Sequence, residues 1–256
     1  MSRASAARCT PVDAGQAPAV RVAKGYFQRS ELPWTSLVFL LPFIILYEVG
    51  TRLLLTDADG TVENRIIAFT KLQDFFRWCG ATGPYLPAMA VVGILLACHI
   101  ARRDTWDVAP RHLFGMLLES AVLAIPLLVL ATLAVRYVPL MAVTRPLPGM
   151  LVLSIGAGIY EELVFRLIAF TLLSVVIIDG LRIEKRLGYL LIVVITSLGF
   201  SLYHYWGHEA FQLRAFAFRT VAGLYFGLIF AFRGFGITAG SHASYDVLVH
   251  ILRAWA

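Results

Sequence analysis

Three pairs of side chains recur at a spacing of four residues inside long apolar stretches: Glu162 and Arg166, Phe200 and His204, and His242 and Asp246. A helix places residues i and i+4 on one face, so Glu162 and Arg166 can form an ion pair. Glu161 points about 100° away from Glu162 and is not neutralised by that geometry. One carboxylate is therefore expected to be structural, and the other is free for chemistry.

Ionisable groups inside an apolar span cost free energy and usually mark a functional site. Glu161, His204, His242 and Asp246 are best satisfied by meeting one another, so we expect a polar pocket that can hold water. The sequence thus favours a polar, water-holding site within the apolar spans.

Each motif also has a structural interpretation when it is taken singly. The pair of Glu162 and Arg166 could join helices, and His204 could be an interfacial histidine. His242 and Asp246 could merely begin a helix. For five further side chains we keep the structural interpretation: Glu48, His99, His112, Glu119 and His250. Three motifs on three spans together favour a site.

The composition is that of a membrane protein. The chain has 256 residues, of which 59% are hydrophobic and 15% charged, and its mean hydropathy is +0.76. Soluble domains average about 45–50% apolar and about 25% charged residues. The same numbers exclude disorder, collagen and coiled coils, and the three cysteines exclude a disulfide scaffold. The net charge of +6 lies mostly between apolar runs, which argues against nucleic-acid binding.

The apolar runs predict an all-α, polytopic transmembrane helix bundle. About seven spans, or eight, are expected, near residues 34–55, 85–100, 112–138, 147–178, 187–206, 213–232 and 235–254. The fourth is long enough to be tilted or to break near Gly156 and Gly158. Residues 56–83 contain an apolar pattern typical of an interfacial amphipathic helix.

The expected organisation is one membrane domain behind a short tail. Residues 1–33 form a basic, mobile or surface-lying tail without a cleavable signal peptide. Residues 34–256 form a single transmembrane domain, with the three motifs in 147–254. A small excess of basic residues in alternate connectors predicts a cytoplasmic N-terminus. Gly223 and Gly227 form a GxxxG pattern, for which packing within the fold is expected.

The three motifs resemble those of the CAAX-protease and bacteriocin-processing (Abi) family of intramembrane endopeptidases, EExxxR, FxxxH and HxxxN/D in that order. The resemblance covers about residues 145–255. It implies that Glu161 activates water with help from His204. It also implies that His242 and Asp246 stabilise the oxyanion, while Glu162 and Arg166 orient the helix.

Asp246 departs from the family members that have asparagine at this position. Asparagine offers an amide donor, whereas an ionised aspartate only accepts hydrogen bonds. Either Asp246 is protonated, or it orients His242 and leaves the histidine to donate. We favour the second, because a carboxylate one turn away stabilises an imidazolium.

No metal or other cofactor is expected, but a zinc site is an alternative. His204 and His208 are also four residues apart, and Glu161 and His242 would complete the coordination. An HExxH pattern is absent, since Tyr205 occupies the position of the glutamate. A chelator would discriminate between the two.

Two non-catalytic functions remain open, a membrane scaffold or immunity protein and a proton-coupled carrier. A scaffold would keep its function in a Glu161→Gln variant, whereas a carrier would lose proton-linked flux. No inverted pair of broken helices is evident, which counts against a carrier. For an endopeptidase the expected partners are the bilayer and a membrane-associated protein or peptide, either prenylated or carrying a leader. A prokaryotic inner membrane is the expected location.

Overall fold

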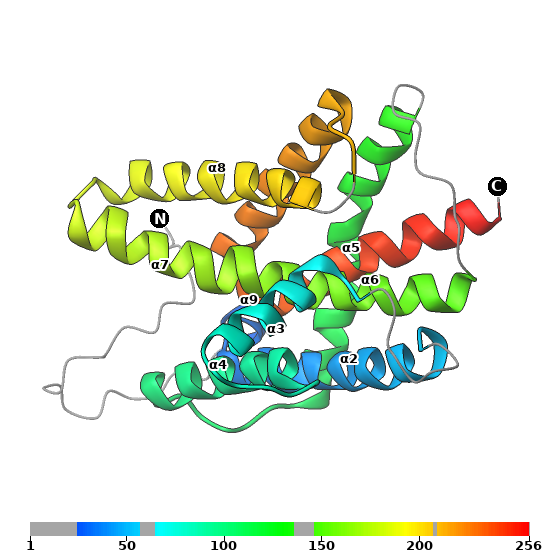
Figure 1. The fold of residues 1–256 in the computed structure, drawn as a ribbon. Helices are drawn as coiled ribbons and strands as arrows, with labels where there is room; N and C mark the ends of the chain where they lie inside the picture. The colour runs from blue at the N-terminus through cyan, green and yellow to red at the C-terminus, as the bar shows by residue number, and fades with distance from the viewer. Residues whose placement is uncertain (1–24, 57–64, 136–145, 207–208, 256) are drawn as a thin grey trace, which may run out of the picture.

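The computed structural model describes residues 25–56, 65–135, 146–206 and 209–255, and these residues form a bundle of helices (Figure 1). The elements are α1 (Tyr26–Ser30), α2 (Pro33–Leu54), α3 (Ile67–Trp78), α4 (Leu86–Arg102), α5 (Pro110–Val135), α6 (Leu147–Glu162), η1 (Leu163–Phe170), α7 (Thr171–Ser174), η2 (Val175–Gly180), α8 (Lys185–Tyr203), η3 (His204–Trp206) and α9 (Leu213–Ala254). No strand occurs among the described residues. The predicted all-α class is confirmed.

Five helical segments of the described chain are long and apolar enough to cross a membrane: Pro33–Leu54, Pro110–Leu133, Leu147–Gly180, Lys185–Trp206 and Leu213–Ala254. Helix α4 is apolar but shorter. The protein is therefore an integral, multi-pass membrane protein. Counting α4 and the two halves of α9 separately gives the seven apolar segments that the sequence predicts.

The N-terminal boundary of the packed structure lies earlier than the sequence suggests. Residues 1–24 of the predicted tail fall outside the described residues, but α1 follows at once and Ser30 is fully buried. Residues 57–64 of the predicted connector also fall outside. After them, α3 buries Ala68 and Phe69 and exposes its charged side chains, as expected for an amphipathic helix.

The rod formed by α6, η1, α7 and η2 carries the first motif (Figure 1), and α6 continues through Gly156 and Gly158. A Cβ atom at Gly158 would lie 2.5 Å from the backbone nitrogen of Ala243, and one at Gly156 would lie 2.1 Å from the Tyr47 ring. Of the two alternatives for this span, a tilt or a break, the break near Gly156 and Gly158 is wrong, because these glycines lie within a continuous helix and permit close packing. The helix instead changes to π geometry at Leu163, directly after the two glutamates, a device frequent at functional sites.

Helix α9 lies at the centre of the bundle and packs against α5, α6 and α8. Its 42 residues would extend about 63 Å, twice the thickness of a bilayer core. Gly234 interrupts it with φ 75° and ψ −176°, backbone angles that glycine adopts readily. Gly223 and Gly227 lie against Ser197 and Val193 of α8, so the GxxxG pattern packs within the fold, as expected.

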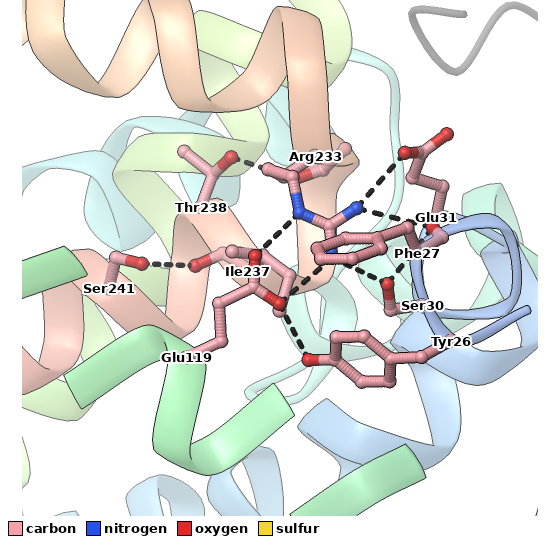
Figure 2. A network of polar contacts seen from close by, with 10 residues as sticks. Tyr26, Phe27, Ser30, Glu31, Glu119, Arg233, Ile237, Thr238 and Ser241 are labelled. Carbon is pink, nitrogen blue, oxygen red and sulfur yellow. Dashed lines mark hydrogen bonds and ion pairs between the residues drawn. The ribbon is translucent and has the colours of Figure 1, made fainter. Parts of the chain in front are cut away.

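A polar network fixes the break in α9 (Figure 2). Arg233 forms a bidentate pair with Glu119 of α5, with N–O distances of 2.5 and 2.8 Å. It also contacts Glu31 at 3.0 Å and Ser30 at 2.8 Å, while Tyr26 donates to Glu119. The first residues of the described chain are thereby joined to the middle of α9.

Helix α8 begins with a capped turn, and the capping residue, Glu184, precedes the apolar span. The Glu184 carboxylate accepts hydrogen bonds from the backbone N–H groups of Arg186 and Leu187, at 3.0 and 3.1 Å. These two hydrogen bonds stabilise the charged carboxylate and hold the pKa of Glu184 below its usual value, the bond from Leu187 more than that from Arg186. This cap defines where α8 starts, and the second motif lies at its other end.

Candidate active site

The three motifs converge on one cavity, although they come from different helices. Glu161 and Glu162 end α6, Phe200 and His204 lie at the end of α8 and in η3, and His242 and Asp246 are in the second half of α9. The cavity has a volume of about 240 Å³ and is lined by Glu161, Phe200, His204, Glu209, Gln212, Ala215, Phe218, Arg219, Ala222, Phe226, His242, Tyr245 and Asp246. All four predicted catalytic residues therefore face a common space.

Glu162 lies behind this cavity and is fully buried. Its Oε2 is 3.1 Å from Nε of Arg166, which is the ion pair that the spacing predicts. Arg166 also donates to the carbonyl of Gly223 at 3.0 Å. The other oxygen of Glu162 lies 2.7 Å from Nδ1 of His242. Glu162 therefore links α6 to α9 in addition to pairing within its own helix.

Glu161 has a different set of partners. Its Oε1 accepts a hydrogen bond from the Tyr203 hydroxyl, and its Oε2 lies 3.8 Å from Nε2 of His242. Among the described span glutamates it is the one without an arginine partner: Glu48 pairs with Arg65, Glu119 with Arg233, and Glu162 with Arg166. The carboxylate that the sequence left unneutralised is also unneutralised by arginine in three dimensions.

The imidazole of His242 is held on both sides. Nδ1 meets Glu162, whereas Nε2 faces both Glu161 and Asp246, the latter at 3.6 Å. The ring also stacks on Phe226, with 4.5 Å between centroids. The contact with Asp246 is longer than a hydrogen bond, so Glu162 makes the shorter contact that orients this histidine.

His204 lies at the same cavity with one nitrogen engaged. Its Nδ1 is 2.8 Å from the carbonyl oxygen of Phe200, one turn earlier. A carbonyl only accepts, so Nδ1 carries a proton and Nε2 of the neutral ring is an acceptor. The second motif thus fixes the tautomer of its own histidine.

Within the described residues, no three His, Cys, Asp or Glu side chains are arranged to hold a metal ion. His208 of the zinc alternative lies outside the described residues. The absence of a cofactor accordingly stays a prediction, and zinc remains the alternative to it.

Tyr203 and the contact between Glu162 and His242 were missed by the sequence analysis. Tyr203 directly precedes a motif histidine in an apolar span, which is the one signal that could have drawn attention to it. The contact between α6 and α9 joins residues 80 positions apart and has no local signal. Arg219 and Glu209, which also line the cavity, form an ion pair at 3.0 Å.

Comparison with known proteins supports the interpretation of this region. Residues 143–248 match the family model of the type II CAAX prenyl endopeptidases, Rce1-like. No curated protein and no solved structure matches the chain significantly. The matched region holds all three motifs and every predicted catalytic residue. The resemblance that the motifs predict, to the CAAX-protease family, is thus confirmed for residues 143–248 as a match to the Rce1-like type II CAAX prenyl endopeptidases.

Proposed function

We propose that this protein is an intramembrane endopeptidase in which Glu161 activates water to hydrolyse a peptide bond of a membrane-associated substrate. One observation carries the proposal: Glu161 is the described span glutamate without an arginine partner, and it lines a cavity together with two histidines. A fixed guanidinium would hold a carboxylate as a permanent ion pair. Glu161 is free of that restraint and can accept a proton.

The reaction follows from the geometry. Glu161 Oε2 takes a proton from a water in the cavity, and the water oxygen attacks the carbonyl carbon of the scissile bond. The negative charge that develops on the carbonyl oxygen is stabilised by Nε2–H of His242, whose Nδ1–H donates to Glu162. When the C–N bond breaks, Glu161 returns its proton to the leaving amine.

His204 and Asp246 complete the site. With Nδ1 donating to the Phe200 carbonyl, Nε2 of His204 accepts the second hydrogen of the water and orients it. Asp246, beside Nε2 of His242, favours an imidazolium with a proton on both nitrogens. His242 is therefore the donor to the oxyanion, and Asp246 supports it through charge.

The substrate is a protein or peptide held at the membrane. The cavity opens among helices that cross the bilayer, and the matching family is named for prenyl endopeptidases. Both features support a prenylated protein cleaved near its C-terminus, ahead of a leader-bearing peptide. A prokaryotic inner membrane is the proposed location.

The decisive experiment compares new peptide termini in membranes that contain the wild type or a Glu161→Gln variant at matched expression. Termini present only with the wild type would establish hydrolysis and identify the substrate class. Glu48→Gln is the matched control, because Glu48 is also buried and bonded to a tyrosine, Tyr160. Termini that persist with Glu161→Gln would refute the role of this carboxylate. If the wild type generates no new termini and the Glu161→Gln variant still supports the phenotype of the gene, the protein acts as a scaffold instead.

Metal dependence has a separate test. We propose that no metal takes part, so cleavage by the purified protein should persist in excess chelator. Loss of cleavage with chelator, its return with zinc and loss of bound zinc in His204→Ala would establish the zinc alternative instead.

A further inference from the structure

Tyr203 is a buried tyrosine whose hydroxyl reaches the proposed base. It is the last residue of α8, only 4% of it is exposed, and its hydroxyl donates to Oε1 of Glu161 on α6. Its ring is enclosed by three aromatic neighbours, Phe165 at 5.1 Å, Phe200 at 6.1 Å and His204 at 4.4 Å between centroids. A side chain enclosed in this way has a fixed hydroxyl position.

The two oxygens of Glu161 consequently have different surroundings. Oε1 is tied to Tyr203, while Oε2 is the oxygen beside Nε2 of His242. A carboxylate with neither oxygen restrained rotates about its terminal bond. A hydrogen bond to one oxygen stops that rotation and leaves the other in a constant direction.

We infer that Tyr203 is a positioning residue that holds Glu161 so that its Oε2 faces the attacking water. This inference rests on the proposed function, because it gives Tyr203 a role only through the carboxylate that activates water. Tyr203 is not among the residues that line the cavity, and its hydroxyl is directed at Glu161, so its role is exerted through the base.

The test uses Tyr203→Phe, which removes one oxygen and keeps the enclosed ring. Tyr160→Phe is the matched control, because Tyr160 is also buried and its hydroxyl donates to a buried carboxylate, Glu48, at 3.1 Å. The probe is a fluorogenic peptide ending in a farnesylated cysteine and three further residues, cleaved by the full-length protein in nanodiscs. We expect kcat of Tyr203→Phe to fall roughly ten- to a hundredfold with KM within about twofold, the range for one hydrogen bond to a charged group. Tyr160→Phe should keep its kcat.

A second measurement reports on the contact itself and needs no activity. Melting temperatures are compared for Tyr203→Phe, Glu161→Gln and the double variant. Coupled side chains give non-additive shifts, so the double variant should be less destabilised than the sum of the two single variants.

The outcomes separate the inference from the proposed function. An unchanged kcat in Tyr203→Phe, or an equal loss of kcat in both tyrosine variants, overturns the positioning role while cleavage by the wild type still stands. Additive melting shifts overturn it as well. The proposed function is refuted if the wild type leaves the peptide uncut and membranes that contain it show no new peptide termini. The positioning role falls with it, and non-additive melting shifts would then mark a purely structural pair.

Discussion

Glu48 and Glu161 lie at two sites of the same bundle that share a buried carboxylate bonded to a tyrosine and differ in the basic side chain beside it. Each carboxylate is buried, and each accepts a hydrogen bond from a tyrosine, Tyr160 in the first case and Tyr203 in the second. Beside Glu48 lies Arg65 at 3.3 Å, whereas the basic side chain that faces Glu161 is His242, at 3.8 Å.

That difference separates a structural carboxylate from a reactive one. Arginine stays protonated at every accessible pH, so the pair of Glu48 and Arg65 has no proton to exchange. The contact of 3.8 Å between Glu161 and His242 is longer than a hydrogen bond, so Glu161 is not held in a fixed ion pair and can take up a proton. Burial of a glutamate alone therefore says little about catalysis, and the identity of its counter-group says much more.

The largest effect should come from exchanging that counter-group. His242→Gln removes the group that faces Glu161 and the proposed donor to the oxyanion, and we expect the cleavage rate to fall by roughly 10²–10³-fold. Arg65→Gln at the other site should change the rate per folded molecule by less than about threefold. Single-turnover kinetics on the substrate found by terminal proteomics measures both. Similar losses in the two variants would break the comparison.

The fully buried ion pair should have the next largest effect. Arg166 and Glu162 are both 0% exposed, whereas the side chains of Arg65 and Glu48 are 8% and 10% exposed. Removing one member of a buried pair typically costs roughly 3–5 kcal/mol, because the other charge is left without compensation. Arg166→Leu should therefore destabilise the protein more than Arg65→Leu.

Denaturant unfolding in mild detergent, followed by tryptophan fluorescence, gives both free energies. Equal losses would mean that Arg65 is as isolated from water as Arg166. A chain carrying Arg166→Leu that keeps wild-type stability would contradict the burial of this pair.

A smaller effect should separate two neighbouring glycines of α6. An added methyl at Gly158 meets the backbone of α9, 2.5 Å from the nitrogen of Ala243 and 2.7 Å from the oxygen of Ala239. At Gly156 it meets the Tyr47 side chain instead. Overpacking costs roughly 1–3 kcal/mol, so both Gly→Ala variants should lose stability.

Only Gly158→Ala should also lose cleavage, because it pushes α6, which carries Glu161, away from the half of α9 that carries His242. The measurement compares, for each of the two variants, the loss of kcat with the fall in melting temperature. Parallel losses would show that the spacing of these helices is not what limits the reaction.

The smallest effect is expected at a carboxylate that belongs to neither site. Glu184 caps α8 through backbone N–H groups, and its pKa is lowered from 4.5. A lowered pKa gives stability that is present above the pKa of the unfolded chain and is lost as the pH falls through the folded value. At neutral pH the wild type should therefore melt at a higher temperature than the Glu184→Gln variant. This difference in melting temperature should disappear as the pH falls below about 4.5. Thermal melts at several pH values measure it, and a constant difference would refute the cap.

Local spacing predicted those parts of the site that depend on one helix. The pair of Glu162 and Arg166 and the unpaired Glu161 could be read from their positions, because i and i+4 share a face whatever the rest of the fold does. The convergence of the three motifs was also expected, since buried ionisable groups need partners. The apolar runs predicted the helices for the same local reason.

What could not be predicted depends on contacts between distant segments. No pattern in the sequence indicated that Arg65 pairs with Glu48 or that Arg233 pairs with Glu119. The change to π geometry at Leu163 was missed as well, and the glycines at 156 and 158 suggested a break where the structure uses them for close packing. Tyr203 was overlooked because a tyrosine in an apolar span is compatible with ordinary burial.

The clamp around Arg233 has a consequence for the order in which the protein is made. Arg233 follows Glu119 by 114 residues and Glu31 by 202, whereas Arg65 follows Glu48 by only 17. At about 5–20 residues per second, ribosomes need roughly 6–23 s to reach Arg233 after Glu119. Until then Glu119 has Tyr26 as a partner but no guanidinium, and Glu31 lacks its arginine. The clamp is therefore completed only after most of the chain has been made, so a nascent chain stalled before Arg233 keeps two partly buried acids without their cation.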